Sequence, residues 1–313
     1  GYRWDVNEEA GVYTFDYSYQ GWFPVISLLA ETGNRQIASP FWESRSIIFR
    51  DNQVGLNVSV PLRFTKNEYS FRVVPSIGMG VNLARDVRIN LDANHVLLQD
   101  AQLAFREQDV VRNDYRVFAL RQARRVPRDI FPRWAQLVDV RYMHTPFSPT
   151  RVSSILSITG VGWFPGLFRH QGLKLSASYQ KRGDTHDEMG SAIYSFRSLV
   201  PYPRGFNGFN HQSLKAFSAD YAFPLLYPDF SIRHLLYLMR VSGYLFADHA
   251  VATLFQNANI NRGLEREQFT SFGFGITGDM HLLRFMAPIS LGVEFVFPQG
   301  GNPESRLIFG TTF

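Results

Sequence analysis

Apolar and polar residues alternate with a period of two along most of the chain. In Val12–Tyr19 every odd-numbered residue is aromatic, and Gly172–Gln180 and Ile289–Phe297 alternate in the same way. This period is typical of β-strands, whose side chains point in turn to the two faces of a sheet. Helical periodicity is nearly absent, and only Asn94–Glu107 is compatible with either a short helix or a long loop.

The connections between these runs alternate in length. Thr65–Glu68 and Tyr227–Asp229 are short and turn-rich, whereas Arg182–Gly190, Val200–Gln212 and Gln256–Gln268 are longer and polar or glycine-rich. Short turns at one end and long loops at the other are typical of outer-membrane barrels, whose strands number about 8 to 26 and are even in number in bacteria. We therefore predict an all-β fold over residues 1–313, a single transmembrane antiparallel β-barrel domain with about 14 to 16 strands.

The composition supports a barrel over a helical membrane protein. Aromatic residues make up 15% of the chain, with 28 Phe and 14 Tyr, yet the mean hydropathy is only −0.14. No uninterrupted apolar run reaches the roughly 18 residues that a transmembrane helix requires. A barrel spans a membrane with half of its strand residues facing a polar interior.

Charge and cysteine content narrow the possible functions. The net charge is +5, carried by 28 Arg and 4 Lys without a nucleic-acid-binding motif, so no nucleic-acid partner is expected. The absence of cysteine excludes thiol catalysis and thiolate metal sites. Asp184–Glu188 lacks the spacing of a metal site. We expect neither an enzyme nor a cofactor nor a bound metal.

One motif points to a family. The loop tip Pro203-Arg204-Gly205-Phe206 is followed about forty residues later by Phe246-Ala-Asp248, and the chain ends on an aromatic residue, Phe313. This combination resembles the Omp85 superfamily of outer-membrane barrels, which implies sixteen strands and a long loop folded into the barrel. The sequence departs from the family pattern at Pro203, usually aliphatic, and at Ala250, usually glycine.

The resemblance implies a loop lock. Arg204 is expected to fold inward and pair with Asp248 through its planar fork of donors. Gly205 would allow a close backbone approach, and Phe206 would pack beside Phe246 or Tyr244. The alternation of Leu307, Phe309 and Phe313 in the last strand resembles the signal by which such barrels are recognised for assembly.

The glycines of the last three strands have two readings. A loosely paired first-to-last seam is compatible with these residues, because glycine weakens strand pairing. They are Gly273, Gly275, Gly278, Gly292 and Gly310. They are equally compatible with barrel curvature and with space for aromatic neighbours.

The resemblance further implies a role in outer-membrane protein insertion or polypeptide translocation, as part of a larger complex in the bacterial outer membrane. The expected partners are outer-membrane lipid including lipopolysaccharide, and client polypeptides or partner subunits. The chain begins almost directly with a strand, without the periplasmic POTRA domains of Omp85 relatives. We therefore expect the barrel part of a longer protein or a reduced branch. A passive anchor or scaffold barrel and a diffusion porin or transporter remain as alternatives.

Overall fold

The computed structural model describes most of the chain as one antiparallel sheet. The described residues are 2–5, 10–38, 45–91, 108–124, 128–147, 153–183, 196–206, 211–233, 235–253, 266–282 and 289–311. They form sixteen strand segments: β1 (Tyr2–Asp5), β2 (Ala10–Tyr19), β3 (Val25–Ala38), β4 (Arg45–Ser59), β5 (Leu62–Lys66), β6 (Tyr69–Leu91), β7 (Gln108–Ala123), β8 (Ala135–His144), β9 (Ser154–Pro165), β10 (Gly172–Arg182), β11 (Ser213–Leu226), β12 (Phe230–Ile232), β13 (Leu236–Thr253), β14 (Arg266–Leu282), β15 (Ile289–Pro298) and β16 (Glu304–Thr311).

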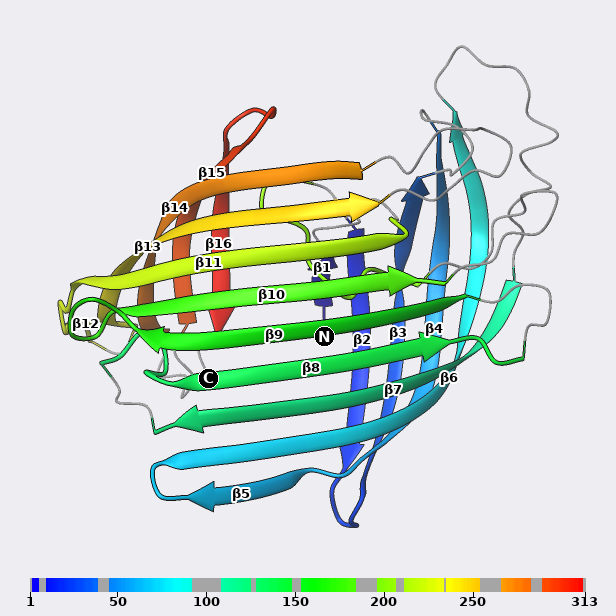
Figure 1. Cartoon of the computed structure of the whole chain (residues 1–313), viewed down its shortest axis with the longest axis horizontal. Coiled ribbons are helices and arrows are strands. Elements are labelled where there is room, and N and C mark those ends of the chain that lie inside the picture. The colour runs from blue at the N-terminus through cyan, green and yellow to red at the C-terminus, as the bar shows by residue number, and fades with distance from the viewer. Residues whose placement is uncertain are drawn as a thin grey trace.

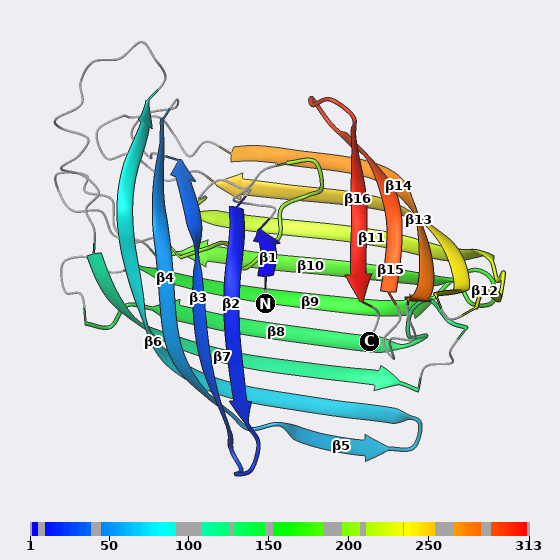
Figure 2. The same cartoon turned by 180° about the vertical axis from the view of Figure 1, so that it is seen from behind.

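The strands are ordered along the sheet as they are along the chain. β5 pairs with the first part of β6 beyond the end of β4, and β12 pairs with the first part of β13 beyond the end of β11. The sixteen segments therefore occupy fourteen positions along the sheet. The exact strand count, for which the family resemblance implies sixteen, stays a prediction. The sheet curls so that β7–β11 face β1, β2, β15 and β16 across an interior (Figures 1 and 2). The predicted fold class, an all-β antiparallel sheet of the barrel type, is confirmed.

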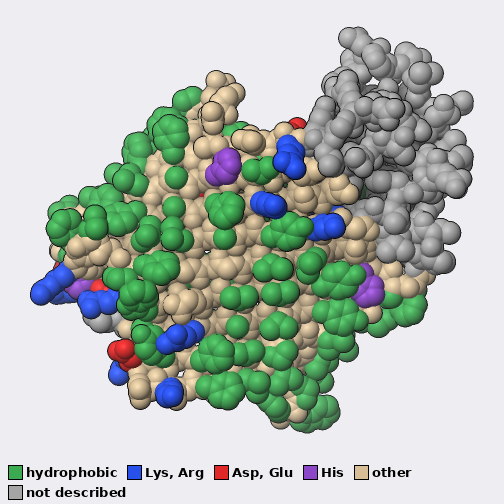
Figure 3. Space-filling model, in the orientation of Figure 1, with side chains coloured by type: hydrophobic (Ala, Val, Ile, Leu, Met, Phe, Trp, Pro, Cys, Tyr) green, Lys and Arg blue, Asp and Glu red, His purple; other side chains and the backbone are tan. Residues whose placement is uncertain are grey.

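The two faces of the sheet follow the alternation in the sequence. Outward positions carry exposed aromatic and aliphatic side chains, as at Tyr13, Phe15 and Tyr17 of β2 and Leu291 and Phe295 of β15. Figure 3 shows these apolar side chains spread over the outside of the sheet. Many inward positions carry charged or hydroxyl side chains. They include Asp51, Arg112, Asp114, Arg116, Asp139, Arg141, Lys174, Asp220, Asp248, Asp279 and Glu294.

The described connections separate the two ends of the sheet. We call the end with the connection between β10 and β11 the loop end, and the end with the β9–β10 connection, residues 166–171, the turn end. The helix or loop predicted at Asn94–Glu107 lies outside the described residues. Within the described part of the chain, no helix is long and apolar enough to span a membrane.

The two ends of the sheet do not pair with each other in the described residues. β1 pairs only with the first residues of β2, up to Tyr13, and the only described partner of β16 is β15. We refer to the junction between β1 and β16 as the seam. Figure 2 looks onto it, with β1 and β2 on one side and β15 and β16 on the other.

Candidate functional site

The segment Phe196–Phe206 leaves the loop end and crosses the interior of the sheet. At its start, buried Phe196 packs with residues of β4, β6, β7, β8 and β9, among them Phe49 and Ile155. Further on, buried Val200 and Tyr202 pack with Leu214 of β11 and with Ala250 and Ala252 of β13. The segment therefore contacts two distant parts of the wall. We call it the inward loop.

A buried glutamine on the wall holds the middle of the inward loop. The Gln180 side-chain oxygen accepts hydrogen bonds from the backbone N–H groups of Leu199 (2.7 Å) and Val200 (3.2 Å). It also accepts one from the Ser198 hydroxyl at 3.2 Å. These bonds satisfy donors that the irregular backbone of the loop would otherwise bury without partners.

Arg204 and Asp248 form a bidentate ion pair at the tip of the loop. Arg204 Nε donates to Asp248 Oδ2 at 2.7 Å and Nη2 donates to Oδ1 at 2.9 Å. The backbone N–H of Arg204 donates to the same carboxylate at 3.1 Å. Ser218 donates its hydroxyl to Asp248 Oδ1 at 2.6 Å. The carboxylate thus fixes both the side chain and the backbone of the loop tip.

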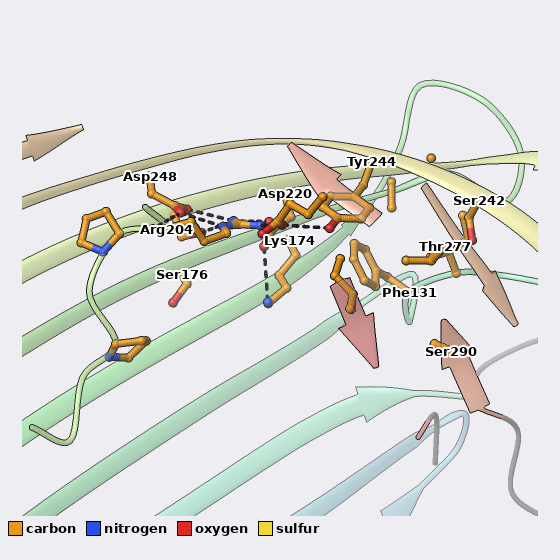
Figure 4. A pocket seen from close by; sticks show the side chains of 18 of the residues that line it. Phe131, Lys174, Ser176, Arg204, Asp220, Ser242, Tyr244, Asp248, Thr277 and Ser290 are labelled. Atoms are coloured by element: carbon orange, nitrogen blue, oxygen red, sulfur yellow. Dashed lines mark hydrogen bonds and ion pairs between the residues drawn. The ribbon is translucent and has the colours of Figure 1, made fainter. Parts of the chain in front are cut away.

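Two further carboxylates surround the same guanidinium. Arg204 Nη2 donates to Asp220 Oδ1 at 2.6 Å, and Nη1 donates to Glu294 Oε2 at 3.2 Å. Lys174 Nζ lies 3.3 Å from the other Asp220 oxygen, so this carboxylate has two cationic partners. Figure 4 shows how Lys174, Asp220, Arg204 and Asp248 converge from the wall and the loop. Arg204 therefore ties the loop to β11, β13 and β15 together.

The surroundings keep Arg204 charged. Burial lowers the pKa of its guanidinium, but the hydrogen bond to Asp248 and the negative charges of Asp220 and Asp248 outweigh this effect and raise the pKa above its usual value. The guanidinium of Arg204 therefore keeps its positive charge beside the carboxylates.

The aromatic floor of the site differs in part from the sequence prediction. The guanidinium carbon of Arg204 lies 3.6 Å from the centroid of the Phe246 ring, within the range of a cation–π contact. The ring that Phe206 meets is Phe269 of β14, edge-on at 5.1 Å, where Phe246 or Tyr244 was predicted. Arg204 covers Phe246, and the Tyr244 hydroxyl donates to Glu294 at 2.8 Å.

Gly205 occupies a position that other residues fit poorly. Its φ is +87°, and an added Cβ would lie 3.0 Å from Val296 Cγ1 and 3.1 Å from Pro298 Cβ. The backbone of the tip therefore approaches β15 more closely than a side chain allows.

Replacing Gly205 is expected to loosen the tip. Gly205→Ala combines an unfavourable φ with two tight contacts, and we expect it to lower the free energy of unfolding by about 1–3 kcal/mol. A urea titration of the refolded protein in lipid vesicles measures this change. Gly300→Ala is a matched control for the cost of placing alanine at a positive φ. Gly300 has a φ of +82°, but nothing lies within 4 Å of its Cβ position. Equal losses in both variants would contradict the close-packing argument.

A cavity of about 620 Å³ lies beside the lock. Hydroxyl and charged side chains from the wall line much of it, including Ser176, Ser242 and Thr277 (Figure 4). Ile130 and Phe131 line it as well, from the β7–β8 connection. The inward loop and the β7–β8 connection therefore narrow the interior from its two ends, and the cavity lies between them.

The β7–β8 connection is itself held against the wall, a feature that sequence reasoning missed. The Arg128 carbonyl accepts hydrogen bonds from Tyr227 (3.2 Å) and from Arg240 (3.3 Å). Next to it, Asp129 binds His170 at 2.8 Å and Arg133 at 3.2 Å. Asp129 is a buried carboxylate in a turn-rich stretch, but no sequence pattern specifies its distant partners.

The remaining predicted residues are placed as follows. Leu307 and Phe309 point outward from β16 and are 85% and 71% exposed. Phe313 and the acidic stretch Asp184–Glu188 lie outside the described residues. Among the described residues, no cluster of three or more His, Asp or Glu side chains is arranged to hold a metal ion.

Comparisons with known proteins identify a fold and no family. No protein-family model and no curated protein matches the chain. Among solved structures, the chain resembles the crystal structure of BamA from Haemophilus ducreyi lacking POTRA domains 1–3, with a TM-score of 0.51 and 10% sequence identity over 97% of this chain. The match covers 62% of the BamA chain, so this protein spans about three fifths of that structure's length. At this identity the likeness is one of fold.

Proposed function

We propose that the chain is an Omp85-like barrel of the bacterial outer membrane. The exposed apolar side chains of the outer face fit a lipid environment, since a soluble protein rarely exposes an apolar surface of this extent. Many charged and hydroxyl side chains face inward, among them Arg112, Asp220 and Glu294, as in transmembrane barrels. The resemblance of the fold to the BamA barrel supports the same assignment.

Within this class, we propose a role in inserting or translocating polypeptides as part of a larger complex. The observation that carries the proposal is the combination of an unpaired seam with a loop locked onto the strands beside it. The described β16 edge has backbone groups free to pair with an incoming strand, which is how β-augmentation proceeds. Arg204 ties β15, the neighbour of β16, to β11 and β13. This would stiffen the wall while the edge exchanges partners.

The inward loop also supports a second candidate, a passive anchor barrel. A segment that packs against opposite parts of the wall and a connection that narrows the other end both favour a plugged interior. This argues against a diffusion porin, which needs an open passage. The two roles differ in the binding partner expected for the β16 edge. An insertion role requires that this edge pairs with incoming polypeptides, whereas a passive anchor does not.

Photocrosslinking along β16 tests the proposal. A photoactivatable residue replaces Ser305 or Leu307 in cells that make the full protein, and cross-linked chains are identified by mass spectrometry. We expect these positions to capture incoming outer-membrane polypeptides. Matched outward positions within the sheet, Phe217 and Leu245, should capture none. Cross-links from β16 only to β1 or β2 of the same chain would overturn the insertion role and favour the anchor.

A further inference from the structure

Three basic residues gather on the outer face at the loop end. They are Lys181 of β10, Lys215 of β11 and Arg266 of β14, and all three are exposed. The chain has only four lysines, so two of them lie here. Figure 3 shows basic side chains over the loop ends of these strands, above the apolar surface.

The strand register places these cations on the outside of the sheet. Each cation lies an even number of residues from an exposed apolar residue of its own strand, so the two side chains point to the same face. The pairs are Lys181 and Leu175, Lys215 and Phe217, and Arg266 and Phe272. Lys181 pairs with Ser213, which pairs with Thr253, which pairs with Arg266. Three strand spacings of about 4.8 Å therefore separate Lys181 from Arg266 by roughly 14 Å. Lys215 lies on β11 between them, two residues farther from the loop end than Ser213.

No acidic side chain neutralises this cluster on the outer face. The described outward positions of β10, β11, β13 and β14 carry no Asp or Glu. Glu267, next to Arg266, points inward, where its carboxylate lies 3.1 Å from His211 Nε2. Within the described part of the chain, none of the three cations has a carboxylate partner. Lys174, by contrast, points inward and pairs with Asp220.

The position of the cluster suggests its ligand. Farther from the loop end, the outer face carries exposed Leu175 of β10, Phe217 of β11 and Leu245 of the intervening strand β13. A basic row directly above an apolar surface is suited to a lipid whose acyl chains cover the apolar side chains and whose anionic headgroup meets the cations. Since long loops of outer-membrane barrels face the cell exterior, the lipid at this end belongs to the outer leaflet.

We propose that Lys181, Lys215 and Arg266 bind the phosphate groups of lipid A, the membrane anchor of lipopolysaccharide. Lipid A carries a phosphate at each end of its disaccharide, and cations on three strands across the sheet fit two separated phosphates better than the single headgroup of a glycerophospholipid. The inference rests on the proposed outer-membrane function and adds a lipid site to it.

A lipid-binding assay with matched variants tests the site. The wild-type barrel and the triple variant Lys181→Gln, Lys215→Gln, Arg266→Gln are reconstituted in phosphatidylcholine nanodiscs and titrated with bisphosphorylated lipid A. We expect the triple variant to bind at least about tenfold more weakly, since each exposed ion pair contributes a factor of a few. The control variant Arg63→Gln, Lys66→Gln, Arg233→Gln removes the same charge from exposed positions of β5 and the β12–β13 turn, and should bind like the wild type.

Two further arms identify the ligand and separate this inference from the proposed function. Dephosphorylated lipid A should bind the wild type as weakly as the triple variant binds bisphosphorylated lipid A. Cardiolipin binding as tightly as lipid A, or equal lipid A binding by the two triple variants, would overturn the site. Flotation with phosphatidylcholine vesicles tests membrane integration independently. A wild type that fails to float contradicts the membrane-barrel assignment, whereas one that floats without lipid A preference contradicts only the lipid site.

Discussion

Arg204→Ala is expected to lower the free energy of unfolding by about 3 kcal/mol, because it leaves Asp220, Asp248 and Glu294 close together without their shared cation. The Arg204 side chain is only 24% exposed, so water replaces little of the lost interaction. Arg204→Lys retains the charge but loses the planar fork, and should recover only part of the difference. Urea titration in lipid vesicles measures all three proteins.

Two comparisons make this expectation specific to the lock. Asp248→Ala alone should also be destabilising, and the double variant with Arg204→Ala should cost less than the sum of the single losses, because the residues share one interaction. Arg50→Ala breaks an exposed pair with Asp86, whose atoms lie 3.6 Å apart, and should cost less than about 1 kcal/mol. An unchanged unfolding curve for Arg204→Ala would refute the lock.

The alternation in the sequence predicted the faces of the strands well, because a period of two follows directly from strand geometry. Leu291, Phe295, Leu307 and Phe309 all point outward, as their spacing predicted. The pattern does not specify which inward residues of different strands lie at the same height. That depends on register, and register is set by turns and bulges whose sequence signals are weak.

The lock illustrates this limit. The resemblance to a family brought Arg204 and Asp248 together, but Asp220 and Glu294 were missed as further partners of the guanidinium. Asp220 lies on β11 and Glu294 on β15, two strands beyond β13. Their distance from Arg204 depends on the register of these strands and on the path of the inward loop, which the alternation does not specify. Both missed carboxylates nevertheless occupy inward positions. An inventory of inward acidic residues on β11, β13 and β15 would have included both of them.

The glycines of β14 were open to two readings, and the structure favours one of them for Gly273 and Gly275. Gly275 lies between Tyr244 and Glu294 in the register, and its missing side chain leaves the path along which the Tyr244 hydroxyl reaches Glu294. Gly273 lies in the same way beside Phe246, the ring beneath Arg204. These two glycines make room for the aromatic floor of the lock.

Gly273→Ala should therefore disturb the lock from below. An added Cβ would lie 2.0 Å from the Phe295 carbonyl oxygen and 2.6 Å from Phe246 Cζ, so both the β15 backbone and the ring must shift. We expect a loss of about 2–3 kcal/mol in the free energy of unfolding, in the range of overpacked cores. Urea titration in lipid vesicles measures it.

The control for this substitution lies in the same sheet. Gly310 of β16 has nothing within 4 Å of its Cβ position, so Gly310→Ala should change stability little. Combining Gly273→Ala with Arg204→Ala should cost less than the two single losses added together, because the displaced Phe246 ring no longer has a guanidinium to support. Fully additive losses would show instead that Gly273 serves strand packing alone, independently of the lock above it.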